Sequence, residues 1–180
     1  GETAEGIAEQ LPDIGHFIKT VSNGLYSVAA KDKSLEGAQL LEPARICAIS
    51  GDLSKHLRTY HAAQVTHVGD DENVAVARTK CLKSIRAIIP HHSGNHEGCL
   101  VENCLYLRLG ANIRAKLHAE QKTMSDDEIR LEVNQQYATQ GRFKGKMMSL
   151  SIMGQTKVTQ VITSRAISYK HLTLTTKSRG

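Results

Sequence analysis

Aromatic residues and proline are scarce in this chain. It contains no tryptophan, two phenylalanines and three prolines, and aromatic residues make up 4% of its 180 positions. Sheets favour aromatic and β-branched side chains, and the turns between strands favour proline and glycine. The scarcity therefore argues against a sandwich or barrel built from many short strands.

Features that direct a chain to a membrane are also missing. No apolar run approaches the roughly 18 residues of a transmembrane helix. The opening segment GETAEGIAEQ has neither the basic nor the apolar part of a signal peptide. We therefore expect no transmembrane segment and an intracellular location, in the cytoplasm or within a viral particle. The four cysteines are then expected to be reduced thiols.

Several catalytic and nucleotide-binding motifs are absent. The sequence has no GxSxG nucleophile turn, no GxxxxGK[ST] phosphate loop, no GxGxxG loop and no CxxC pair. It also carries no signature of an RRM, KH, helix-turn-helix or zinc-finger module. Its carboxylate clusters, 70–72 and 126–128, stand at expected helix starts, where the helix dipole favours negative charge. The sequence thus indicates no named module.

The N-terminal region has a heptad-like apolar pattern. Apolar residues recur at alternating steps of four and three from Ile7 to Val28, which is typical of a helix with one buried seam. Pro12 is tolerated in a first helical turn, so we expect a helix from about Pro12 to Ala30. Residues 1–35 would form a helical arm, which packs either on the core of its own chain or on a neighbouring subunit.

The remaining residues, 36–180, are expected to form a helical core domain. Pro43 would open a short helix that Gly51 ends, and Asp52 would cap the next one. A further helix would run from Asp70 or Asp71 until Pro90 stops it.

Later in the chain, the apolar segment Cys99–Leu109 is expected to be split by Gly110 from a second helical piece. Ser125 and Glu128 match a capping box at the start of another helix. The segment 147–154 could be strand or helix, and 171–176 has a strand-like pattern, so the two could form a small strand pair near the C-terminus. The prediction is a mainly α, irregular bundle of six to eight helices.

Charge is distributed unevenly along the sequence. Residues 1–75 carry eleven acidic and six basic side chains, whereas residues 76–180 carry seven acidic and seventeen basic ones. No acidic residue follows Glu132, so the part 133–180 is purely basic and would attract polyanions. Its candidate nucleic-acid-binding residues are Arg142, Lys144, Lys146, Lys157, Arg165, Lys170, Lys177 and Arg179.

The stretch 141–146, GRFKGK, is the most suggestive part of this region. Arg142, Lys144 and Lys146 could contact a phosphate backbone, and Phe143 could stack on a base. In the simpler interpretation, the stretch is an exposed loop whose Phe143 packs into the core. Basic residues of this kind also form ordinary solvated faces, or pair with the acidic half of a second copy.

A group of histidines and cysteines between residues 91 and 104 is the other candidate site. Thiolates and imidazoles are the ligands that zinc prefers. The candidate ligands are His92, His96, Cys99 and Cys104, which would make zinc a structural cofactor. Alternatively, no cofactor is present, the cysteines are small apolar core residues and the histidines lie in a solvated loop.

Two functions of different classes fit these observations. The favoured one is a non-enzymatic, self-associating structural protein, such as a capsid, nucleocapsid or matrix component. It would bind nucleic acid, most simply RNA, through its basic half and would form homo-oligomers. The alternative is a small enzyme, such as a hydrolase or viral protease, that uses the cluster at 91–104. That enzyme requires a pocket gathering at least two of His91, His92, His96 and Cys99.

Overall fold

The computed structural model describes residues 13–35, 42–167 and 169, and these residues form an all-α protein. This confirms the mainly α prediction. The six α-helices are α2 (Asp13–Lys31), α3 (Pro43–Thr66), α4 (Asp71–His92), α5 (Leu105–Ala119), α6 (Asp126–Gln140) and α7 (Ile152–Ile167). Two short 3₁₀ turns, η1 (Lys33–Leu35) and η2 (Val101–Asn103), complete the elements.

No strand occurs in the described residues. Of the two segments considered for a strand pair, 147–154 forms an irregular connection followed by the first residues of α7. The other, 171–176, lies outside the described residues.

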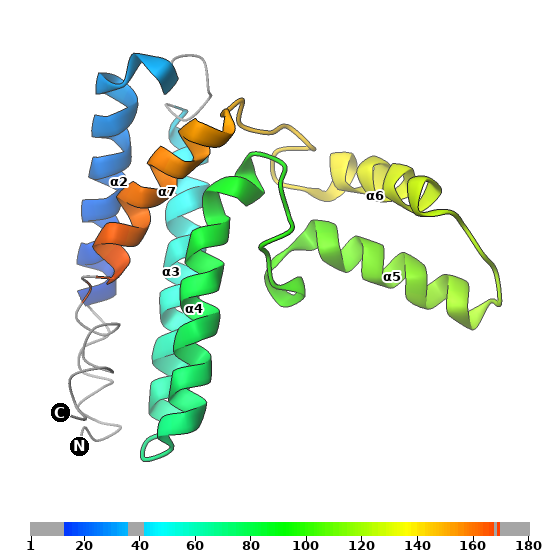
Figure 1. The fold of residues 1–180 in the computed structure, drawn as a ribbon, viewed down its shortest axis with the longest axis horizontal. Coiled ribbons are helices and arrows are strands. Elements are labelled where there is room, and N and C mark those ends of the chain that lie inside the picture. Colours follow the sequence, from blue (N-terminus) through cyan, green and yellow to red (C-terminus); the bar gives the residue numbers. More distant parts are fainter. Residues whose placement is uncertain (1–12, 36–41, 168, 170–180) are drawn as a thin grey trace.

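The helices are arranged as a bundle with a hairpin beside it. Helices α2, α3, α4 and α7 lie side by side, whereas α5 and α6 form an antiparallel pair that projects away from them (Figure 1). The bundle holds the main apolar core, and the hairpin has a small core of its own made by Leu109, Ile129 and Val133. Two segments connect these parts: one runs from the end of α4 to the start of α5, and the other from the end of α6 to the start of α7 (Figure 1).

Helix α2 confirms the helix predicted from about Pro12 to Ala30. Of its seam residues, Ile14, Val21 and Leu25 are fully buried in the core shared with α3, α4 and α7. The ring of Phe17 stacks on Tyr169 with centroids 4.4 Å apart. The described part of the arm therefore packs on its own chain, the first of the two alternatives.

Helix α3 differs from the prediction because Gly51 does not end it. One continuous helix runs from Pro43 to Thr66. Glycine in a helix interior costs about 1 kcal/mol relative to alanine. Burial of Ile49 and Leu53, each 0% exposed, outweighs that cost. Asp52 is consequently not a helix cap, and its side chain is available for a contact with α4.

Helices α4 and α5 also run further than expected. Asp70 caps α4 by accepting a hydrogen bond from the Asn73 amide, as predicted. Pro90 lies inside the last turn, and the helix continues to His92. Gly110 does not split α5. It lies where α5 meets α6, and a Cβ placed there would be 3.7 Å from a methyl carbon of Val133.

The capping box predicted at Ser125 and Glu128 is present. The Glu128 amide donates to the Ser125 hydroxyl at 3.2 Å, and the Ser125 amide donates to the Glu128 carboxylate at 2.9 Å. None of the described helices combines the length and the apolar character that crossing a bilayer requires.

Candidate metal centre and adjacent basic pocket

The segment between α4 and α5 folds back sharply after His92. The amide of Asn95 donates to the Pro90 carbonyl at 2.9 Å, and the amide of Gly94 donates to the His91 carbonyl at 3.1 Å. Gly94 has a φ of +90°, in the left-handed region that favours glycine. A Cβ at this position would also lie 2.0 Å from the Met147 sulfur. The turn therefore brings the following loop back over the end of α4.

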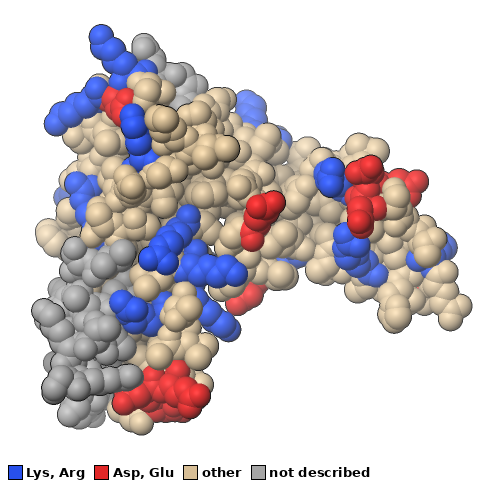
Figure 2. All heavy atoms as spheres, in the orientation of Figure 1, with Lys and Arg blue, Asp and Glu red and all other residues tan. Residues whose placement is uncertain are grey.

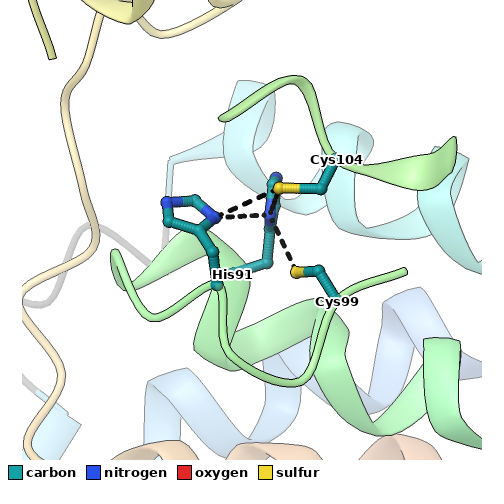
Figure 3. A group of neighbouring side chains, drawn as sticks. His91, Cys99 and Cys104 are labelled. Carbon is teal, nitrogen blue, oxygen red and sulfur yellow. Dashed lines mark hydrogen bonds between the residues drawn. The ribbon is translucent and has the colours of Figure 1, made fainter. Parts of the chain in front are cut away.

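Four side chains converge at this turn and form the metal-ligand cluster, defined as His91, His96, Cys99 and Cys104. His91 lies in the last turn of α4, and Cys104 immediately precedes α5. One potential ligand atom from each residue lies within 4.8 Å of all the others. Figure 3 shows His91, Cys99 and Cys104 pointing toward one another from the end of α4 and from the returning loop.

The distances within the cluster fit a tetrahedral zinc ion. The His91 Nδ1 atom lies 3.0 Å from His96 Nδ1, 3.4 Å from Cys99 Sγ and 3.6 Å from Cys104 Sγ. Cys104 Sγ lies 3.4 Å from His96 Nδ1. With ordinary zinc bond lengths, the edges of a tetrahedron measure about 3.3 Å between two nitrogens and about 3.6 Å between nitrogen and sulfur. The four side chains are thus already close to the positions that zinc requires.

The two thiols of the cluster have opposite pKa shifts. The pKa of Cys104 is lowered by hydrogen bonds, chiefly from Cys99 and then from His91 and His96. The pKa of Cys99 is raised by its hydrogen bond with Cys104 and by burial. The pair therefore favours one thiolate that is stabilised by its neighbours. A metal ion would displace the remaining proton, because zinc binds the thiolate form.

The sequence prediction named His92 as a ligand, but the structure places His91 in the cluster instead. His92 is buried and points elsewhere. Its Nε2 atom lies 2.7 Å from an Asp52 carboxylate oxygen, and its Nδ1 lies 3.3 Å from Arg45 Nη1. Consecutive helical residues point about 100° apart, so only one of the two histidines can face the cluster. The other three predicted ligands are brought together as expected.

Aromatic rings from the hairpin surround His96. The His96 ring stacks on Tyr106 of α5 with centroids 4.3 Å apart and an interplanar angle of 9°. Tyr137 of α6 packs edge-on against both rings, at 5.9 Å from His96 and 5.6 Å from Tyr106. These contacts fix the orientation of the imidazole and tie the cluster to both helices of the hairpin.

A pocket of about 280 Å³ lies next to the cluster, between the bundle and the hairpin. We call it the basic pocket. Its lining combines His91, His92 and His96 with cations from separate elements. The cationic residues that line it are Arg45, Arg108, Arg142 and Lys146, and the one carboxylate is that of Asp52.

Arg45 is the buried member of this set, at 2% exposure. Its guanidinium lies over the ring of Phe143, 3.6 Å from the centroid. Arg45 therefore covers one face of the Phe143 ring. A nucleic-acid base stacked on Phe143, as the sequence suggested, would need such a face. Burial lowers the pKa of Arg45, although an arginine stays charged at any ordinary pH.

The basic residues predicted to bind nucleic acid do not form one surface in the described parts. Arg142, Lys144 and Lys146 are exposed on the loop after α6. Lys157 pairs with Asp32 at 3.2 Å, and Arg165 lies against Gly24 of α2. The remaining candidates, Lys170, Lys177 and Arg179, lie outside the described residues.

A basic stripe on α4 was missed in the sequence. Lys80, Lys83 and Arg86 are exposed at intervals of three residues, so they lie on one side of the helix. Figure 2 shows Lys and Arg atoms gathered over α4, between the acidic turn that joins α3 to α4 and the hairpin. The spacing of three is visible in the sequence, but acidic residues elsewhere in 76–132 mask this group in the charge totals.

Comparisons with known proteins found no counterpart of this chain. No family model, no curated protein and no solved structure matches it.

Proposed function

We propose that this chain is a non-enzymatic helical protein that holds a structural zinc ion and binds nucleic acid, most simply RNA, through its exposed basic residues. The metal-ligand cluster is the observation that carries the proposal. Four suitable ligand atoms converge within 4.8 Å at the point where the bundle meets the hairpin. A self-associating structural component, such as a capsid or nucleocapsid protein, is the role we favour.

The composition of the cluster favours a structural zinc ion over a catalytic one. Structural zinc has four protein ligands, whereas catalytic zinc has three and keeps one position for water or substrate. His91, His96, Cys99 and Cys104 would fill all four positions. The ion would link the end of α4, the returning loop and the start of α5, and so fix the hairpin relative to the bundle.

The charge layout supports the nucleic-acid part of the proposal. Arg142, Lys144 and Lys146 lie on an exposed loop beside the basic pocket. The stripe Lys80, Lys83 and Arg86 adds a second group of cations on α4. Cations of this kind contact phosphates regardless of base sequence, and their contribution falls steeply as salt rises.

Zinc binding is tested by measuring bound metal in the purified chain and in Cys99→Ser. We expect about one zinc per chain in the wild type, and in the variant a loss of zinc together with a lower melting temperature. Cys47→Ser is the matched control, because Cys47 is an exposed thiol outside the cluster. A wild type that melts at the same temperature with and without zinc would disprove the structural role.

Nucleic-acid binding is tested with fluorescence anisotropy of a short single-stranded RNA. Replacing Arg142, Lys144 and Lys146 by Glu should abolish binding without unfolding the chain. The control replaces Arg114, Lys116 and Lys122 by Glu, which changes the charge equally at the far end of the hairpin. Equal binding by both triple variants would rule out the loop as the binding surface.

Self-association is tested separately by light scattering at low and high salt, with and without that RNA. Large particles that need RNA and dissolve at high salt are the expected result. A monomer that is indifferent to RNA would contradict the assembly role while leaving the zinc site standing.

An enzyme is the second candidate, because the basic pocket does gather His91, His92 and His96. In that case Cys99 would be the nucleophile and His91 its base, since their Sγ and Nδ1 atoms lie 3.4 Å apart. Two observations weigh against this pair: Cys99 lines a separate pocket with His91, and its hydrogen bond with Cys104 raises its pKa, whereas a nucleophilic thiol needs a lowered one. Hydrolysis of generic peptide and ester substrates that disappears in Cys99→Ser, with no zinc bound to the wild type, would favour this candidate.

A further inference from the structure

Arg45 is a buried cation without a directly bound anion. It is 2% exposed, and its Nε atom has no hydrogen-bond partner among the described residues. Its two hydrogen bonds are long, to the His92 ring and the Lys146 carbonyl, each at 3.3 Å, and its third contact is with the face of the Phe143 ring. A buried charge is costly unless a counter-charge and hydrogen bonds satisfy it.

His92 stands between Arg45 and the nearest carboxylate of the pocket. Arginine has no acceptor atom, so the His92 Nδ1 must accept the hydrogen bond from Arg45. The His92 Nε2 then carries the proton and donates to Asp52. Asp52 therefore reaches Arg45 only through the His92 ring. The guanidinium, with five N–H groups in a planar fork, keeps donors for another partner.

Further cations stand around Arg45 at the edge of the basic pocket. Arg108 comes from α5, whereas Arg142 and Lys146 come from the loop after α6, and all three are exposed. Segments far apart in the sequence thus place four cations around one cavity that holds a single carboxylate. Without an anion between them, these cationic side chains would repel one another.

We propose that the basic pocket binds a phosphate group, with Arg45 as its buried anchor and Arg108, Arg142 and Lys146 at its rim. Arginine forks match phosphate oxygens in pairs. The volume of about 280 Å³ lies just below the range of small-molecule sites, roughly 300–1,000 Å³. It therefore fits one phosphate with its sugar.

This inference rests on the proposed function in one respect, because it identifies the phosphate as one from an RNA strand. The phosphate of a free nucleotide would be recognised by the same side chains. The two sources are distinguished by using inorganic phosphate, a nucleoside monophosphate and a short single-stranded RNA as three separate probes of the same protein.

The experiment measures binding of these probes to the zinc-loaded full chain by NMR, at constant ionic strength. The Arg45 Nε–H resonance is assigned by its absence in Arg45→Lys. We expect inorganic phosphate to shift this resonance, while chloride does not. In Arg108→Ala/Arg142→Ala, whose residues are exposed, phosphate affinity should fall at least about tenfold, as expected when paired charge-assisted bonds are lost. Arg114→Ala, another exposed arginine on α5, should bind as the wild type does.

The outcomes separate this inference from the proposed function. Phosphate and RNA that both shift the Arg45 resonance support both. A phosphate or nucleotide response without RNA binding supports the pocket and contradicts the nucleic-acid role. RNA that binds without moving the Arg45 resonance, and equally well to Arg45→Lys, overturns the pocket and leaves the nucleic-acid role standing. If chloride shifts the Arg45 resonance as phosphate does, the proposed phosphate site is also overturned.

Discussion

The Nε2 atom of His92 lies 2.7 Å from an Asp52 carboxylate oxygen, and this contact joins the middle of α3 to the last residue of α4. It sets the direction of both histidines at this helix end. His92 turns toward α3, where it also accepts a hydrogen bond from Arg45. His91, one residue earlier, is left facing the returning loop and the cysteines.

The first prediction separates the two neighbouring histidines. His91→Ala should lower zinc content to well below one ion per chain, because it removes one of the four ligands. His92→Ala should retain zinc, because its ring bonds to Asp52 and Arg45 instead. Metal analysis after dialysis against a weak chelator provides the measurement. Equal zinc loss in both variants would contradict this assignment. It would mean that His92 is itself a ligand, or that His92 is needed to keep the four ligands of the cluster in place.

The second prediction concerns the hairpin. Helices α5 and α6 pack mainly on each other and have a small core formed by Leu109, Ile129 and Val133. The metal-ligand cluster stands where their chain leaves the bundle. Removing zinc with a strong chelator should therefore accelerate amide hydrogen exchange in α5, α6 and the loop 93–104. Exchange in α2, α3 and α7 should change little, since their core lies in the bundle.

Hydrogen exchange followed by mass spectrometry, with and without chelator, tests this expectation. Cys47→Ser serves as the control for effects of cysteine chemistry on α3, since Cys47 is exposed and outside the cluster. Uniform acceleration across all helices would indicate that zinc supports the whole fold. No change in the hairpin would contradict the role assigned to the cluster.

The third prediction is a pH dependence that arises from His56. Burial lowers its pKa to about 4, opposed in part by the charge of Asp52 and assisted by Lys55 and His91. In the unfolded chain the pKa is about 6.5, so the unfolded state binds the proton more tightly. Stability is therefore fully present above pH 6.5 and is lost as pH falls toward 4. The loss reaches up to about 3 kcal/mol.

His56→Gln should weaken this dependence, because glutamine does not titrate. Urea unfolding of both proteins between pH 4 and pH 8, in excess chelator, gives the difference between their slopes. Subtracting one pH dependence from the other removes the contribution of titratable groups that both proteins share, including the histidines of the metal-ligand cluster. Parallel curves would show that His56 is not the group whose protonation destabilises the fold.

Much of the secondary structure could be predicted because its signals are local. The seam from Ile14 to Leu25 marks α2, and the pair Ser125 and Glu128 marks the start of α6, since both depend only on residues a few positions apart. The helix breaks predicted at Gly51 and Gly110 were wrong, because they depend on contacts that are not local. Whether a glycine breaks a helix depends on what its neighbours bury, and that is decided by the tertiary packing.

The site was predictable in composition but not in detail. The thiols and imidazoles of His96, Cys99 and Cys104 indicated zinc by their ligand type, and the structure brings these three together. The choice between His91 and His92 depends on Asp52, forty residues away, which no local pattern reveals. The role of Arg45 was hidden likewise, since its neighbours Phe143 and Lys146 are about a hundred residues distant.

The last prediction follows from Gly51. This glycine is exposed within α3, and a Cβ placed there would meet nothing within 4 Å. Gly51→Ala should therefore stabilise the protein by up to about 1 kcal/mol, the difference in helix propensity. That corresponds to a rise in melting temperature of about 2–4 °C for a chain of this size.

Gly94→Ala provides the contrast for this prediction. Gly94 has a positive φ, and the added methyl group would meet the Met147 sulfur. The same substitution should here lower the melting temperature and also zinc content, because the turn after α4 delivers His96 and Cys99 to the cluster. Thermal unfolding and metal analysis of the two variants measure both effects. A Gly51→Ala variant that melts below the wild type would mean that α3 needs the conformational freedom of glycine, as at a bend or hinge.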